Sequence, residues 1–131
     1  MSIQKSKIVL DVNGKPLNVY LASPPGGRPG VLVLPSWWGL KPFFKEVCDR
    51  LAELGYTALA PDYYGGRVGN TIDEAKELQQ GVESDFDAMS AMIQAAKDHL
   101  VSLRPGQPIG IVGFSMGTDW AVITAAALES A

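Results

Sequence analysis

A short turn near the end of the sequence carries the residues best suited to chemistry. Residues 113–117 read Gly-Phe-Ser-Met-Gly, a G-x-S-x-G pattern. Where a buried strand precedes this pattern and a helix follows it, the turn is sharp and holds the serine hydroxyl clear of the backbone. The serine then lies at a helix N-terminus, where free amides favour a developing negative charge. Ser115 is therefore a candidate nucleophile, and the amide of Met116 is a candidate oxyanion donor.

The elements that position this turn are predicted by hydrophobic patterning. Ile109–Gly113 predicts a buried strand before the turn, and the alanine-rich segment Met116–Leu128 predicts a helix after it. Two further apolar runs, Val31–Leu34 and Thr57–Ala60, predict buried parallel strands. The helices expected between the strands are Phe43–Leu54, Thr71–Gln79 and Val82–Leu103.

The alternation of strands and helices predicts an α/β fold. From Val31 onward it favours a mostly parallel sheet with helices on both faces, in a single domain. Before it, Lys7–Val12 and Leu17–Leu21 flank Asn13-Gly14, which predicts an antiparallel hairpin with a type I′ turn.

The helix expected at 43–54 has an apolar stripe at the helical period and Gly55 placed to cap its C-terminus. The stripe consists of Phe44, Val47, Cys48, Leu51 and Leu54. The only cysteine lies on this stripe, so Cys48 is predicted to be a small buried hydrophobe rather than a reactive thiol. After the next strand, Asp62 is predicted to brace its own turn.

Composition excludes several classes of function. The 131 residues are 47% hydrophobic and carry a net charge of −3, without a basic stripe for nucleic acid. No Cys/His cluster has metal-ligand spacing, so no metal is expected. The longest apolar stretch, Trp120–Leu128, is too short to span a bilayer. Because the first residues, MSIQKSK, lack the apolar region of a signal peptide, a soluble cytoplasmic protein is expected.

A longer run of sequence resembles a known family. The run is VLVLPSWWGLKPFFKEVCDRLAELGYTALAPDYYGG, followed later by IGIVGFSMG. Its W-G-L step, amphipathic helix, L-G-Y and A-P-D-x-Y are similar to the first half of dienelactone hydrolase family proteins, which have the α/β-hydrolase fold. The resemblance extends from Val31 to the last residue.

The resemblance implies an ester or lactone hydrolase without a cofactor. It implies Ser115 as nucleophile and the backbone amides of Trp37 and Met116 as oxyanion donors. Ser36, Trp38 and Tyr64 are expected to line the substrate pocket; the alternative for the paired tryptophans and for Tyr64 is packing against the sheet.

Two departures from the family pattern change the expected chemistry. Many members carry Cys where Ser115 stands and Glu where Ser36 stands, and that glutamate governs the ionisation of the cysteine. A serine nucleophile has no thiolate to control, so the two differences agree with each other. Members that act on an anionic dienelactone bind its carboxylate with arginines, whereas Arg67 and Lys76 are the only cations in the comparable stretch.

The base and the acid of a catalytic triad are missing. In this fold the chain order is Ser, then Asp or Glu, then His, yet the only histidine, His99, precedes Ser115. His99 is expected near the far end of its helix, and Asp119 on the last helix cannot also orient a distant histidine. Residues 1–131 are therefore predicted to be the N-terminal portion of a hydrolase domain, truncated after the nucleophile helix.

The strand at 109–113 would then be an exposed edge. Its partner is expected to be the protein's own C-terminal half or another chain. This leaves two alternatives to the enzyme: a non-catalytic α/β interaction module that binds through this edge, and a flavodoxin-like binder of a nucleotide or flavin. The second is disfavoured because Ile109–Gly117 contains no phosphate-binding turn.

Overall fold

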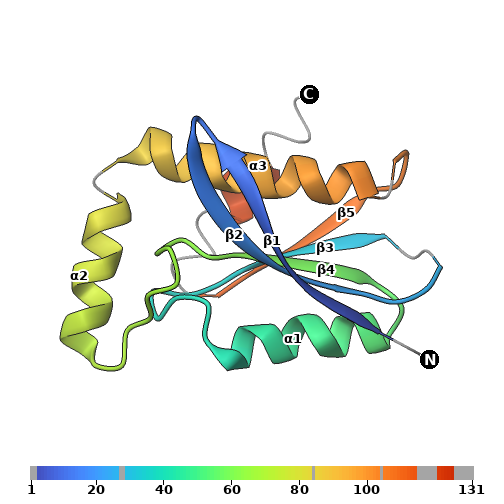
Figure 1. Cartoon of the computed structure of the whole chain (residues 1–131), viewed down its shortest axis with the longest axis horizontal. Helices are drawn as coiled ribbons and strands as arrows, with labels where there is room; N and C mark the ends of the chain where they lie inside the picture. The colour runs from blue at the N-terminus through green and yellow to red at the C-terminus, as the bar shows by residue number, and fades with distance from the viewer. Residues whose placement is uncertain (1–2, 27–28, 84, 104, 115–120, 126–131) are drawn as a thin grey trace.

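A computed structural model of the chain describes residues 3–26, 29–83, 85–103, 105–114 and 121–125 (Figure 1). One five-stranded sheet has the order β1-β2-β4-β3-β5. Its strands are β1 (Gln4–Val12), β2 (Lys15–Ser23), β3 (Gly30–Leu34), β4 (Thr57–Pro61) and β5 (Ile109–Gly113). The helices are α1 (Pro42–Glu53), α2 (Ile72–Glu83) and α3 (Phe86–Leu103). Residues 121–125, inside the predicted last helix, are also helical, and the rest of that helix lies outside the described residues.

The predicted hairpin and the predicted parallel strands are both present. β1 and β2 pair antiparallel around Asn13 and Gly14, whose φ angles of 52° and 84° are those of a type I′ turn. β3 pairs parallel with β4 on one side and with β5 on the other. β2 joins β4 antiparallel, so the hairpin extends a three-stranded parallel core.

The sheet is covered on both faces, as predicted for the α/β fold. Figure 1 shows α3 on one side of the sheet and α1 on the other. Because side chains alternate along a strand, β3 contributes to two cores. Leu32 and Leu34 pack in the cluster that includes α3, while Val31 and Val33 pack in the cluster that includes Cys48 of α1.

The end of α1 confirms the glycine cap and corrects one residue of its predicted stripe. Gly55 has a φ of 101°; its amide bonds to the Ala52 carbonyl at 2.9 Å, and the Tyr56 amide bonds to the Leu51 carbonyl at 3.0 Å. This is a Schellman motif. Leu54, predicted on the apolar stripe, is 64% exposed, because it is the C-cap residue beyond the last turn that packs on the sheet.

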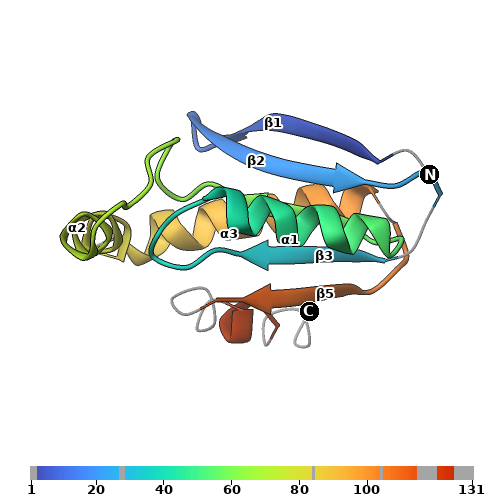
Figure 2. The ribbon, with the colours of Figure 1, turned by 90° about the horizontal axis from the view of Figure 1, so that it is seen from below.

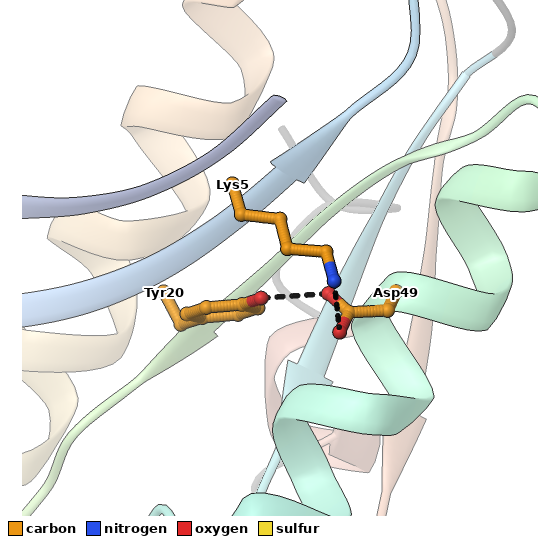
Figure 3. Close-up of polar contacts among 3 residues, drawn as sticks. All are labelled: Lys5, Tyr20 and Asp49. Carbon is orange, nitrogen blue, oxygen red and sulfur yellow. Dashed lines mark hydrogen bonds and ion pairs between the residues drawn. The ribbon is translucent and has the colours of Figure 1, made fainter. Parts of the chain in front are cut away.

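A small polar network ties α1 to the hairpin (Figure 3). Tyr20 on β2 donates its hydroxyl to Asp49 Oδ1 of α1 at 2.7 Å, and Lys5 Nζ on β1 lies 3.2 Å from Asp49 Oδ2. Burial, together with the hydrogen bond to Asp49, raises the pKa of Tyr20, so the phenol stays protonated as the donor. The lysine is half exposed, so its ion pair adds little stability. The tyrosine bond is the stronger link between the two elements.

The helix predicted over Val82–Leu103 is wrong at its start. Val82 belongs to α2, which continues to Glu83, and α3 begins only at Phe86. The reason is a local cap: Asp85 Oδ1 accepts a hydrogen bond from the Ala88 amide at 3.0 Å, which starts a new helix there. None of the helices in the described part of the chain is long and apolar enough to cross a membrane.

Close packing at Gly30 predicts a measurable loss of stability on substitution. A Cβ at this first residue of β3 would lie 2.7–2.8 Å from Leu100 of α3, whereas a Cβ at Gly81 of α2 would meet nothing within 4 Å. We expect Gly30→Ala to lower the free energy of unfolding by about 1–3 kcal/mol through overpacking. The matched control Gly81→Ala is expected to raise it by about 0.5–1 kcal/mol, because alanine favours a helix. Urea denaturation of both variants checks this, and equal effects would contradict it.

Candidate active site

The carboxyl ends of the parallel strands bring Gly113 and Phe114, the first two residues of the G-x-S-x-G pattern, beside the end of β3, where the loop 35–40 (the tryptophan loop) starts. β3 and β5 run parallel in register up to Leu34 and Gly113. The ladder continues one residue further, because the Phe114 amide donates to the Leu34 carbonyl at 3.1 Å. Phe114 therefore lies next to Leu34, the residue that directly precedes the loop 35–40. Ser115 and Met116, the predicted nucleophile and oxyanion donor, lie outside the described residues.

The loop 35–40 is a tight turn built on Ser36. The Gly39 amide donates to the Ser36 carbonyl at 3.1 Å, and the Trp38 amide donates to Ser36 Oγ at 3.4 Å. Gly39 has a φ of 87°, which favours glycine. The turn uses the amides of residues 38 and 39, and within the described chain the Trp37 amide has no acceptor. Ser36 is buried and its hydroxyl serves this turn, a local role that its prediction as a pocket residue did not include.

A second loop, 62–67, holds the first one in place. The Asp62 carboxylate accepts hydrogen bonds from the amides of Tyr64 at 3.1 Å and Gly66 at 2.6 Å, which confirms that it braces its own turn. Tyr64 then donates its hydroxyl to the Trp37 carbonyl at 3.0 Å. The two loops therefore meet through a bond between a buried phenol and the tryptophan backbone.

Two backbone contacts strengthen this junction. The Gly69 amide donates to the Trp38 carbonyl at 2.9 Å. A Cβ at Gly39 would lie 3.0 Å from both the Arg67 carbonyl oxygen and the Tyr64 ring, so only glycine allows the loops to approach this closely. Sequence reasoning missed this junction, because the residues involved are 25 or more positions apart in the chain.

An aromatic cluster fixes the start of α1 against the end of β5. The Phe114 ring lies 5.2 Å from Phe44 and 6.0 Å from Phe43 between ring centroids, in edge-to-face arrangements. Trp37 and Trp38 form a further edge-to-face pair at 5.7 Å, and Lys41 Nζ lies 5.0 Å from the Trp38 ring. The residues before Ser115 and the tryptophan loop are thus both held by the same end of α1.

A pocket of about 470 Å³ opens between the loop 62–67 and α2. It is lined by Tyr63, Tyr64, Arg67, Glu77, Leu78, Gly81 and Val82. Tyr64 lines this pocket, and its hydroxyl also contacts the tryptophan loop. Arg67 and Glu77 place opposite charges at this pocket, and its volume suits a small molecule.

Cys48 and His99, which sequence reasoning rejected, lie away from this edge. Cys48 is a fully buried residue of α1. Burial, followed by the charge of Asp49, raises the pKa of its thiol to about 12. His99 is next to Leu100, which packs over Gly30 at the opposite end of β3 from Leu34. That strand alone spans about 13 Å. Among the described residues, no group of three His, Cys, Asp or Glu side chains could hold a metal ion.

Comparisons with known proteins agree with this fold. A profile described as the dienelactone hydrolase family matches residues 17–131. A relative from Aquifex pyrophilus, protein usf, is 37% identical over 116 residues, which are 84% of this chain and 50% of the relative. The carboxymethylenebutenolidase of Rhodococcus opacus is 26% identical over 109 residues, 83% of this chain and 43% of the enzyme. The structure of m3DLH superposes with a TM-score of 0.76 at 31% identity, covering 88% of this chain and 50% of that protein.

These similarities define the class of protein. The parallel strands flanked by helices form a partial α/β-hydrolase fold. More narrowly, the chain belongs to the dienelactone hydrolase family, whose members are hydrolases. It spans about half the length of the relatives it matches.

The burial of Cys48 predicts that its thiol is inert in the folded protein. With its pKa raised to about 12, the thiolate needed for reaction is scarce at pH 8. We expect Ellman's reagent at pH 8 to modify Cys48 only when urea unfolds the chain. Rapid modification of the native protein would contradict this prediction.

Proposed function

We propose that this chain is the nucleophile-bearing, N-terminal portion of a serine-type ester or lactone hydrolase. The observation that carries the proposal is the bond between the Phe114 amide and the Leu34 carbonyl. Ser115 is the next residue along the chain, and adjacent Cα atoms are about 3.8 Å apart. The residue before the candidate nucleophile therefore lies beside the end of β3, from which the loop that contains Trp37 starts.

In the proposed reaction, Ser115 Oγ forms a bond to the carbonyl carbon of the substrate. A base takes the hydroxyl proton and delivers it to the departing alcohol oxygen when the ester bond breaks. Water then attacks the acyl carbon of the acyl-enzyme. The base takes a proton from this water and returns it to Ser115 Oγ when the bond between the serine and the acyl group breaks. The amides of Trp37 and Met116 would stabilise the tetrahedral oxyanion. The unused Trp37 amide in the described structure supports its part of this assignment.

The base and the acid must come from polypeptide outside these 131 residues. His99, the only histidine, lies at the end of α3 near Gly30, at the opposite end of β3 from Phe114. We therefore propose that a further segment supplies a histidine and a carboxylate, and that the chain alone has little turnover. The segment would also pair with β5, which borders the sheet beyond β3 in the described chain (Figure 2).

The substrate in this proposal is a small ester or lactone. The pocket of about 470 Å³ beside Tyr64 supports this size. Ser36 and Trp38 shape the loop next to it, and no metal or organic cofactor takes part. A cytoplasmic location is also part of the proposal, and the single cysteine of the chain is compatible with it.

Covalent labelling tests the nucleophile. We expect a fluorophosphonate probe to label Ser115 when the chain is combined with the segment that supplies the histidine and acid, and to label the chain alone far more slowly. The control Ser115→Ala should abolish labelling, because the attacking hydroxyl is gone. Absence of labelling at Ser115 even in the complete protein would defeat the proposal. Mass spectrometry of the labelled peptide identifies the site.

A second candidate function is a non-catalytic module that binds a partner through β5. It is favoured by one observation: in the described sheet β5 pairs only with β3, and Val112 on it is 37% exposed. An unpaired apolar edge promotes pairing with another strand.

Association in solution tests this edge. We expect the chain alone to associate, as seen by native mass spectrometry, and Val112→Lys to weaken association, because a lysine on an edge strand discourages pairing. The control Val9→Lys places the same charge on β1, at the other side of the sheet. A stable monomer of 14.0 kDa would argue against both the module and the missing segment.

A further inference from the structure

Two adjacent buried tyrosines differ in the hydrogen bonding of their phenolic hydroxyl groups. Tyr63 and Tyr64 are 4% and 8% exposed, and their rings lie 6.1 Å apart. The Tyr64 hydroxyl donates to the Trp37 carbonyl at 3.0 Å. The Tyr63 hydroxyl is buried and has no hydrogen-bond partner among the described residues, and its pKa is raised by that burial. Only one of the two phenols is therefore connected to the candidate active site.

Tyr64 is held at its backbone as well as at its hydroxyl. Its amide donates to Asp62 Oδ1 at 3.1 Å, and the other carboxylate oxygen accepts from Gly66. Its ring packs against Gly39, where a Cβ would come within 3.0 Å of it. The backbone and ring of Tyr64 are therefore already fixed when its hydroxyl bonds to Trp37, and no further ordering of this side chain is needed during a reaction.

The bond from Tyr64 completes the anchoring of one peptide unit. The carbonyl of Trp37 and the amide of Trp38 belong to the same planar peptide. Tyr64 holds its carbonyl, and Ser36 Oγ accepts from its amide at 3.4 Å. With both polar groups fixed, this peptide cannot rotate without breaking two hydrogen bonds. The orientation of the preceding Trp37 amide is restricted in consequence.

We propose that Tyr64 is a positioning residue for acyl transfer: its hydroxyl fixes the Trp37 backbone so that the Trp37 amide is preorganised as an oxyanion donor. This inference rests on the proposed function, since it assigns a task at the same site. Oxyanion donors stabilise a transition state only when they are already aimed at the developing charge. A hydroxyl that fixes the donor loop changes the rate of acylation without touching the substrate.

The matched variants Tyr64→Phe and Tyr20→Phe test this inference, because each phenol donates one hydrogen bond and only the bond of Tyr64 reaches the tryptophan loop. Each removes one phenolic oxygen and keeps the ring, so the wall of the pocket at Tyr64 remains. In the complete protein, labelling by the fluorophosphonate probe is followed at several probe concentrations to separate the maximal rate constant from the half-saturating concentration. We expect Tyr64→Phe to lower the maximal rate constant about tenfold or more, with an unchanged half-saturating concentration. Tyr20→Phe, which removes a hydrogen bond to Asp49 and leaves the pocket and both loops intact, is expected to stay within about twofold of the wild type.

The outcomes separate this inference from the proposed function. If wild-type protein is labelled at Ser115 but Tyr64→Phe reacts as fast as wild type, the positioning role is wrong and the nucleophile stands. An effect confined to the half-saturating concentration would make Tyr64 a binding residue and overturn the inference. An equal loss in Tyr20→Phe would assign both effects to the loss of a stabilising hydrogen bond anywhere in the fold and also overturn it. If the wild type is not labelled, the proposed function fails and this inference fails with it.

Discussion

The parallel ladder between β3 and β5 is the constraint on which the candidate site depends. It runs in register from Gly30 and Ile109 to Leu34 and Gly113, and one further bond brings Phe114 to Leu34. Two segments about 80 residues apart in sequence therefore end at the same edge of the sheet. Without this register Gly113 and Phe114 would have no fixed position relative to the tryptophan loop. The helices α1 and α3 pack on the two faces of the sheet and stabilise the strands in this register.

The loops at this edge are ordered by hydrogen bonds rather than by burial alone. Asp62 holds the backbone of its own loop, and Tyr64 carries that order across to Trp37. Gly39 permits the close approach, because its φ of 87° and the nearby Tyr64 ring exclude a side chain. Backbone amides that act in catalysis need such rigidity, since their energetic value depends on direction.

Much of the fold could be predicted from local signals in the sequence. Asn13-Gly14 predicted the hairpin, Gly55 predicted the end of α1, and the apolar run at 31–34 predicted a strand buried on both faces. The break between α2 and α3 was missed, because the apolar spacing continues through Val82 and hides the cap at Asp85. Periodicity reports which residues face a core, but it does not report where a helix is interrupted.

The candidate site was only partly predictable for a different reason. The position of Ser115 after a strand was visible in the sequence, as was the tryptophan loop after another. The bond from Tyr64 to Trp37 was not, because it joins residues 27 positions apart and depends on how two loops meet in space. For Ser36 the sequence predicted a pocket residue but did not reveal the bond that its hydroxyl accepts from the Trp38 amide.

The free side of β5 in the described sheet also limits how this sheet can be extended by another strand. A second copy of the chain joined through β5 by a two-fold axis perpendicular to the sheet would place the two edge strands antiparallel. Its own serine turn would then lie at the far end of the seam. In the described sheet β5 has one free side, which accepts either the second copy or a strand that completes the candidate site, but not both. Self-association and catalytic completion are thus geometrically exclusive at this border.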